Sequence, residues 1–351
     1  MARTRTIWLA CLLLLVTACG EQQQVFRLTG ETMGTTYNIV AVDRAGHIEL
    51  KDLQTAVGNT LARVNQQMSN WDPSSEISRF NQTRSTDPTP ISSELYAVMS
   101  AANEVHRDSM GQFDVTLGPL IELWGFGART PETPVPSDAE IAATLAQVGQ
   151  ETVLELTDQP PALRKARPDA SVYLAAIAKG YGVDQLALTL ASFGLTDYMV
   201  EIGGDLVAAG QNPDGEAWRI GIERPVIAPR SVQEIVTVSG LGMATSGDYR
   251  NYFEQDGTRY THIIDAETGR PITHRTASVT VLAESAMLAD AWATALLVLG
   301  QERGLALSEQ HNLAALFIAR AEPPNDSEAD ETGPHFKATA NSYFEALQAT
   351  N

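Results

Sequence analysis

The segment from Ala286 to Leu299 carries apolar side chains on almost every side of the helix that it predicts, and Gly300 ends it. A helix that is apolar all round is buried, so the rest of the chain must fold around this one. Asp290 lies inside the segment, and a buried carboxylate requires a partner. Because Asp290 and Thr294 are four residues apart, they share one helix face and offer two hard oxygens to Mg²⁺ or Ca²⁺. An exposed helix face is the plainer interpretation of this spacing, but the apolar surroundings argue against it.

Helices and strands are interspersed along the remainder of the chain. Apolar residues three or four positions apart, a capping box and a terminal glycine predict helices at residues 50–68, 95–105, 137–148 and 174–193. Alternation with a period of two predicts strands at residues 36–41, 198–202, 218–222, 233–238 and 276–282. The pattern indicates a mixed α/β (α+β) protein with two lobes.

The N-terminus has the pattern of an export signal. Arg3 and Arg5 precede an apolar run at residues 7–16, which is too short for an ordinary transmembrane helix. The run ends in Val-Thr-Ala-Cys, which resembles a bacterial lipobox and implies cleavage after residue 18 and lipidation of Cys19. A plain signal peptide is the alternative. We expect a signal peptide at 1–18, a lipidated Cys19 with a polar tether at 19–27, and a lipid anchor on the periplasmic side of the cell membrane, the inner rather than the outer one.

Cysteine content and charge narrow the chemistry. The chain has two cysteines, Cys11 and Cys19, and the expected processing leaves no free thiol for a disulfide or a zinc–thiolate site. Removal of residues 1–18 takes away Arg3 and Arg5 and changes the formal net charge from −19 to −21. Such an acidic domain is not expected to bind nucleic acid. A polyanionic substrate would need a local metal ion, a lysine or a helix N-terminus.

Several other segments carry groups suited to binding or catalysis. Residues 176–182 combine small residues with Lys179, which could meet a phosphate, although a surface lysine on a packed helix is favoured from this segment alone. Residues 244–253 predict a small-residue turn followed by Asp, Tyr and Arg. His262 could act as a general base, but a lone histidine is more often structural. Ring stacking and core packing are both compatible with two aromatic segments, 68–73 and 123–127.

The order of these segments is more specific than any one of them. Eight motifs follow one another at residues 33–37, 75–81, 113–127, 176–181, 203–205, 245–253, 262–271 and 289–294. Together they resemble the ApbE family of FAD:protein FMN transferases over about residues 28–300. The lipobox belongs to the same resemblance.

The resemblance implies a T-fold-like architecture of two lobes with FAD between them. It assigns a transferase domain to residues 28–320 and an acidic loop with a C-terminal segment to residues 321–351. In the implied reaction, which needs Mg²⁺, a threonine hydroxyl of a target protein attacks the FMN-side phosphorus of FAD. AMP then leaves, and FMN stays on the threonine. The implied acceptors are subunits of redox-driven ion-pumping complexes.

The resemblance also assigns roles to individual residues. Asp290, Thr294 and the backbone carbonyl of Ala176 would hold Mg²⁺, so that Asp290 serves catalysis. His262 would take the proton from the incoming threonine. The residues expected to contact FAD are Met33 and Trp71 on the flavin side, with Gln112, Phe113, Asp114, Tyr173, Lys179 and Ile264.

Three positions depart from the family pattern. Tyr173 stands where an aspartate is usual, which removes a carboxylate from the expected pocket. Trp71 replaces a common tyrosine and preserves stacking, and Ala293 stands where some members have a second aspartate.

Other functions are compatible with the same residues. A periplasmic lipoprotein that only binds flavin would need the pocket but no turnover. A Mg²⁺-dependent FAD pyrophosphatase would use water in place of the acceptor threonine. A redox flavoenzyme of the Rossmann type is disfavoured, because no Gly-x-Gly-x-x-Gly follows a predicted strand.

Overall fold

The fold is built on one eight-stranded sheet in which every neighbouring pair is antiparallel. The computed structural model describes residues 23–126, 133–226, 229, 231–321 and 335–349. The predicted mixed α/β class is confirmed. The strands of the sheet are, in spatial order, β1 (Gln24–Thr32), β2 (Thr35–Asp43), β6 (Asp197–Ile202), β7 (Asp205–Ala209), β10 (Leu241–Gly247), β15 (Thr276–Ala283), β16 (Ala314–Ala321) and β17 (His335–Ala340).

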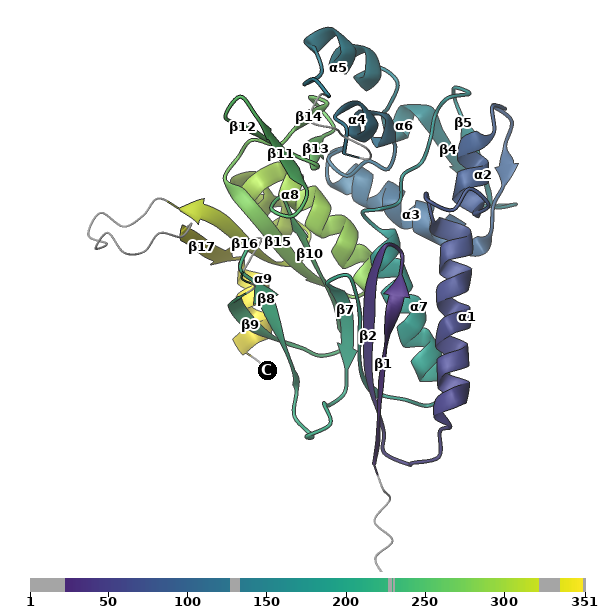
Figure 1. Cartoon of the computed structure of the whole chain (residues 1–351), viewed down its shortest axis with the longest axis vertical. Coiled ribbons are helices and arrows are strands. Elements are labelled where there is room, and N and C mark those ends of the chain that lie inside the picture. The colour runs from purple at the N-terminus through teal and green to yellow at the C-terminus, as the bar shows by residue number, and fades with distance from the viewer. Residues whose placement is uncertain (1–22, 127–132, 227–228, 230, 322–334, 350–351) are drawn as a thin grey trace, which may run out of the picture.

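The sheet divides into two halves with the same layout. In the first half, β1 and β2 are followed by helix α7 (Ala178–Ser192) and then by β6 and β7. In the second half, β10 and β15 are followed by helix α8 (Ala286–Gln310) and then by β16 and β17. The halves join where β7 pairs with β10, and α7 and α8 pack side by side (Figure 1). This layout agrees with the T-fold-like, two-lobed architecture expected from the sequence.

Helix α8 is the buried helix that the sequence predicts. Its alanines at positions 289, 291, 293 and 295 are fully buried, and its apolar residues share one core with α3 (Ser93–Asp108) and β15. Gly300, with φ of 73° and ψ of 174°, interrupts the helix where the sequence places its end. A second helical segment continues from there to Gln310, which the sequence analysis did not anticipate.

Helices α7 and α8 approach each other closely because glycine occupies the contact. A Cβ atom on Gly180 would lie 2.2 Å from the carbonyl oxygen of Ala286. Each helix also supplies a carboxylate to the other. Asp184 of α7 accepts hydrogen bonds from the backbone N–H groups of Ala286 and Met287 at 2.8 and 2.9 Å. Asp290 of α8 accepts one from Gly180 at 3.2 Å, so each carboxylate caps the N-terminus of the neighbouring helix.

Alternate residues of the strands face opposite layers. Val279 and Val281 of β15 pack with the helices, whereas Leu282 packs on the other face of the sheet. That second face is covered by a hairpin, β8 (Trp218–Glu223) and β9 (Val232–Val238), and by helix α9 (Ser342–Ala349). The central strands are therefore buried on both sides.

The remaining elements form two insertions and one long helix. Helix α1 (Leu50–Met68) packs beside α7, and the insertions stand together at one end of the sheet (Figure 1). The first insertion, between β2 and β6, contains α2 (Glu76–Gln82), β3 (Thr89–Pro90), α3, α4 (Gly118–Leu123), α5 (Asp138–Leu145), α6 (Gln150–Val153), β4 (Leu154–Thr157) and β5 (Ala162–Lys165). The second, between β10 and β15, contains β11 (Tyr252–Gln255), β12 (Thr258–Thr261), β13 (Ile264–Asp265) and β14 (Arg270–Pro271).

The two insertions are joined through one tryptophan. Trp124 is buried, and its Nε1–H donates a hydrogen bond to the carbonyl oxygen of Gly269 at 2.9 Å. Its ring also lies 5.5 Å from the ring of Tyr260, and Leu120 and Ile264 pack into the same small core. The aromatic segment that includes Trp124 is therefore part of the core.

Two predicted boundaries near the helix contact are wrong. Helix α7 begins at Ala178 rather than Leu174, because Ile177 has φ of −150° and ends the turn before the helix. Ala176 consequently lies in that turn. The predicted turn at residues 244–247 is the end of strand β10. Strand β10 also lies close to α8, since a Cβ atom on its Gly242 would lie 2.2 Å from the backbone nitrogen of Ala286.

The ends of the predicted domain also change. Strand β1 begins at Gln24, inside the segment 19–27 that was expected to be a tether, because its residues pair with β2 from that position. Strand β17 and helix α9 belong to the predicted segment 321–351, and β17 extends the sheet by pairing with β16. The predicted signal peptide, Cys19 and the acidic stretch at 322–334 lie outside the described residues. Within the described part of the chain, no helix is long and apolar enough to cross a membrane.

We expect Gly180→Ala to destabilise the fold by about 3 kcal/mol, because its Cβ would meet backbone that cannot move aside. The matched control is Gly58→Ala in α1, where nothing lies within 4 Å of the added atom. Relief of glycine's backbone entropy should stabilise that variant by about 0.5–1 kcal/mol. Urea unfolding measures both changes, and equal stability of the two variants would contradict this account of the α7–α8 contact.

Candidate active site

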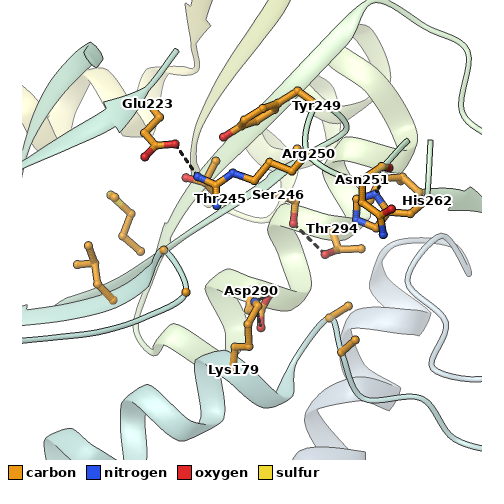
Figure 2. Close-up of a pocket in the computed structure, with 18 of the residues that line it drawn as sticks. Lys179, Glu223, Thr245, Ser246, Tyr249, Arg250, Asn251, His262, Asp290 and Thr294 are labelled. Carbon is orange, nitrogen blue, oxygen red and sulfur yellow. Dashed lines mark hydrogen bonds and ion pairs between the residues drawn. The ribbon is translucent and has the colours of Figure 1, made fainter. Parts of the chain in front are cut away.

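A cavity of about 920 Å³ opens where α7, α8, β7 and β10 meet the two insertions. Figure 2 shows side chains from these separate elements directed toward one space, with Lys179 and Asp290 below Thr294 and Ser246. The predicted site residues that line the cavity are Gln112, Phe113, Asp114, Tyr173, Ala176, Lys179, His262, Ile264, Asp290 and Thr294.

A lysine between two carboxylates lies at the base of the cavity. Lys179 Nζ pairs with Asp205 and lies 3.1 and 3.2 Å from the two carboxylate oxygens of Asp290. Asp205 and Asp290 are only 2% and 3% exposed. Burial lowers the pKa of Lys179, but the two carboxylates outweigh burial and raise that pKa above its ordinary value. The positive charge of Lys179 is therefore paired with Asp205 and Asp290 and is not free to bind a ligand.

The cluster carries surplus negative charge above about pH 7, where both of its carboxylates are ionised. Two carboxylates and one ammonium group sum to a net charge of about −1 when all are ionised. Burial, followed by the charge on Asp290, raises the pKa of Asp205 to about 7. A buried group of this kind favours an additional cation nearby.

The oxygens around Asp290 have the chemistry that a hard cation requires. Asp290 and Thr294 lie one turn apart on α8 and both line the cavity. The carbonyl oxygen of Ala176 accepts no hydrogen bond from any residue that the structure describes, and Ala176 also lines the cavity. Thr294 Oγ1 lies 2.9 Å from Ser246 Oγ. One carboxylate, a hydroxyl and a carbonyl fit Mg²⁺ with water completing its shell.

This site would not be found by counting acidic and imidazole ligands. Across the described ranges, no group of three or more His, Cys, Asp or Glu side chains could hold a metal ion. A metal at Asp290 would therefore depend on backbone and hydroxyl oxygens and on the substrate's own phosphates.

His262 is held in the orientation of a neutral base. Its Nδ1–H donates to the backbone oxygen of Asn251 at 3.0 Å, which leaves Nε2 as the unprotonated nitrogen. Burial lowers the pKa of His262, so the ring is neutral at pH 7. Phe126 packs edge-on against it at 6.3 Å. A neutral imidazole at a cavity wall can accept a proton.

Two of the predicted FAD contacts have clear structural surroundings. Asp114 accepts hydrogen bonds from the backbone N–H groups of Thr116 and Gln150 at 2.6 and 2.8 Å, so its carboxylate holds the cavity wall together. Tyr173 stands in the cavity, and burial raises the pKa of its hydroxyl. Its hydroxyl is therefore a neutral hydrogen-bond donor in the cavity.

Met33 and Trp71 do not line the cavity. Met33 lies in the turn between β1 and β2 with φ of 51° and packs against the core. Trp71 lies in the turn after α1 and is 73% exposed. Because neither residue lines the cavity, their contact with the flavin stays a prediction.

Several groups in and around the cavity were not expected from the sequence. Asp205 was noted only as part of a Gly-Gly-Asp motif, yet it holds Lys179. Ser246, Glu223 and Arg250 received no role, although all three line the cavity. A carboxylate at the start of a strand after two glycines was the available signal for Asp205. No local signal pairs Glu223 with Arg250.

Known proteins resemble this chain over most of its length. A family profile described as the ApbE family matches residues 33–317. The chain belongs to the ApbE family. An ApbE relative from Vibrio cholerae, named FAD:protein FMN transferase, is 47% identical over 317 residues, which cover 90% of this chain and 94% of the relative. One from Escherichia coli K12 with the same name is 36% identical over 347 residues, covering 95% and 97%.

Solved ApbE structures have the same fold. The flavin transferase ApbE from Vibrio cholerae superposes with a TM-score of 0.81 at 44% identity, covering 92% of this chain and 99% of that one. The apo form of the Pseudomonas stutzeri flavinyl transferase ApbE also gives 0.81, at 38% identity, covering 94% and 98%.

We expect Lys179→Met in this ApbE-family chain to lose about 3–5 kcal/mol of stability, because Asp205 and Asp290 would be left as buried carboxylates without their cation. Asp205→Asn should cost less, since Lys179 keeps Asp290. Lys51→Met, at an exposed position of α1, should change stability by less than about 0.5 kcal/mol. Denaturant unfolding at pH 7.5 compares them, and similar losses in Lys179→Met and Lys51→Met would contradict a buried ion cluster.

Proposed function

We propose that this ApbE-family protein is an FAD:protein FMN transferase that moves FMN from FAD to a threonine hydroxyl of an acceptor protein, with Mg²⁺ as cofactor and AMP as the second product. The observation that carries the proposal is that Asp290, Thr294, Ala176 and His262 line one cavity. Family membership and the name shared by its curated relatives supply the reaction class.

The reaction requires the site to hold the two phosphate groups of FAD next to the hydroxyl of the acceptor threonine. When the hydroxyl oxygen bonds to the FMN-side phosphorus, the bond from that phosphorus to the AMP oxygen breaks. His262 is the group suited to take the hydroxyl proton, because its Nε2 is unprotonated. Mg²⁺ held by Asp290, Thr294 and the Ala176 carbonyl would supply positive charge for the diphosphate oxygens.

The chain's own charges explain why such help is needed. The protein carries a formal net charge of −19, and Lys179 is neutralised by its two carboxylate partners. Without a further cation, a diphosphate in this cavity would face Asp290 and Asp205 at close quarters. Positioning by the cavity wall, including the Asp114 loop, supplies the rest of the catalytic effect.

The proposal extends to location and partners. The charged N-terminus, the apolar run and Cys19 support export, lipidation and a periplasmic membrane anchor, most simply at the inner membrane. The acceptors we propose are subunits of redox-driven ion-pumping complexes. The acceptor threonine would enter the same cavity as FAD.

The decisive experiment incubates the protein with FAD, Mg²⁺ and a candidate acceptor, and measures covalent flavin by in-gel fluorescence together with AMP. We expect flavin on the acceptor and an equal amount of AMP. AMP without labelling would instead indicate a pyrophosphatase, and neither product would indicate a flavin-binding protein.

Metal dependence is measured in the same assay. A chelator should abolish labelling, and excess Mg²⁺ should restore it. Asp290→Asn should lose Mg²⁺ binding by calorimetry and lose turnover by about 100-fold or more, because one ligand charge is removed. Undiminished labelling in the chelator would contradict the metal role.

The lowered pKa of His262 predicts the acid limb of the rate. A base works only when it is unprotonated, so kcat/KM should rise with pH through a pKa below 6.5 and then level off. His262→Gln should lower kcat by about 10²–10⁴-fold and remove this limb while FAD binding persists. An unchanged pH profile in His262→Gln would exclude the residue as the base.

A further inference from the structure

Arg250 extends across the cavity from the turn that follows β10. Its Nη2 lies 2.6 Å from a carboxylate oxygen of Glu223, at the end of β8 (Figure 2). The side chains of Arg250 and Glu223 are 53% and 32% exposed, whereas the two carboxylates that hold Lys179 are only 3% and 4% exposed. Both residues line the cavity. This ion pair therefore connects two walls of the cavity at its solvent-facing side.

The backbone that carries Arg250 is firmly held. Asp248 is buried, and its two carboxylate oxygens accept hydrogen bonds from Arg320 at 2.6 and 2.8 Å. Its backbone N–H donates to the carbonyl oxygen of Ala277 at 3.0 Å. The base of the Arg250 side chain is thus fixed relative to the sheet, while the guanidinium group remains at the solvent-facing side.

An aromatic ring directs the side chain. Tyr249 is buried, and its ring lies 5.6 Å from the Arg250 guanidinium carbon. The ring occupies the space left by Gly247, where a Cβ atom would lie 2.5 Å from Tyr249 Cε1. The Gly-Asp-Tyr-Arg sequence therefore has a packing reason at each position before Arg250.

The charges of the cavity wall distinguish Arg250 from Lys179. The acidic residues in the wall are Asp114, Glu201, Glu223 and Asp290, and the basic ones are Lys179, Arg219 and Arg250. Lys179 cannot change partners without exposing two buried carboxylates to each other. Arg250 can, because its own side chain and that of Glu223 are both accessible to water.

We propose that Arg250 is a diphosphate-binding residue that exchanges Glu223 for the diphosphate of FAD. This inference rests on the proposed function, which requires a nucleotide diphosphate in the cavity. A guanidinium group binds two phosphate oxygens at once, and that charge-assisted pair outweighs a surface ion pair with one carboxylate. Glu223 is then a competitor that occupies the arginine until the nucleotide enters.

The exchange makes opposite predictions for its two partners. Removing the arginine should weaken binding of a diphosphate, whereas removing the competing carboxylate charge should strengthen it. Neither change should affect a flavin without phosphate. A merely structural ion pair would instead make both substitutions act in the same direction.

The test uses calorimetric binding of ADP and of riboflavin to the full protein in Mg²⁺. We expect Arg250→Gln to weaken ADP binding about tenfold or more and to leave riboflavin binding within about twofold. Glu223→Gln should tighten ADP binding by about twofold or more. Thermal unfolding of each variant verifies that the fold is intact.

The matched control is a second Arg–carboxylate pair outside the cavity wall. Arg270 lies 2.6 Å from Asp138, and both side chains are exposed. Arg270→Gln and Asp138→Asn make the same charge changes and should leave ADP binding unaltered. Equal weakening by Arg270→Gln would show that only net charge matters and would overturn the proposal.

Three other outcomes would also overturn it: unchanged ADP binding in Arg250→Gln, loss of riboflavin binding to the same extent, or weaker ADP binding in Glu223→Gln. Loss of ADP binding in Arg219→Gln but not in Arg250→Gln would show that Arg219, and not Arg250, binds the diphosphate. Because ADP binding needs neither acceptor nor turnover, its outcome can be distinguished from that of the transferase assay. A protein that fails to label any acceptor can still pass or fail this test.

Discussion

The contact between helices α7 and α8 is the constraint on which the site depends. Gly180 lets the two helices touch through their backbones, and each helix caps the other with a carboxylate. Asp290 is therefore placed at the N-terminus of α7, next to Lys179 and the turn that contains Ala176. A carboxylate buried in an apolar helix would otherwise be unfavourable. The same contact that joins the two halves of the sheet thus makes a buried negative site at their junction.

Charge gives that site its selectivity for a particular kind of ligand. Lys179 is held by Asp205 and Asp290, which leaves the cluster with surplus negative charge in an acidic protein. An anionic nucleotide can bind in this environment only if a metal ion binds with it or if a basic side chain leaves its carboxylate partner to pair with it. A metal ion at Asp290 and the exchangeable Arg250 would both offset the negative charge of the diphosphate. Lys179 stabilises the fold through its two carboxylate partners, whereas Arg250 is available to bind the substrate.

Elements with a clear apolar period were predictable, whereas some elements that pack between two layers were not. Helix α1 was anticipated over its whole length because its apolar residues occupy one face. Strand β16 was missed, since it is buried on both sides and its continuous apolar run has no alternation. Residues 244–247, the end of strand β10, were interpreted as a turn because they are small. In both cases the missing information was the neighbouring layer.

The sequence by itself determined the buried helix, the shared face of Asp290 and Thr294, and the ordered motifs that the family profile confirms. These features follow from local period and spacing, which a linear chain records directly. Only the tertiary structure decided that Asp205 holds Lys179 and that Glu223 holds Arg250. Such pairs join residues on different elements, and their partners are chosen by how the strands and helices pack. No local pattern encodes that choice, because the distance that matters is the one in space.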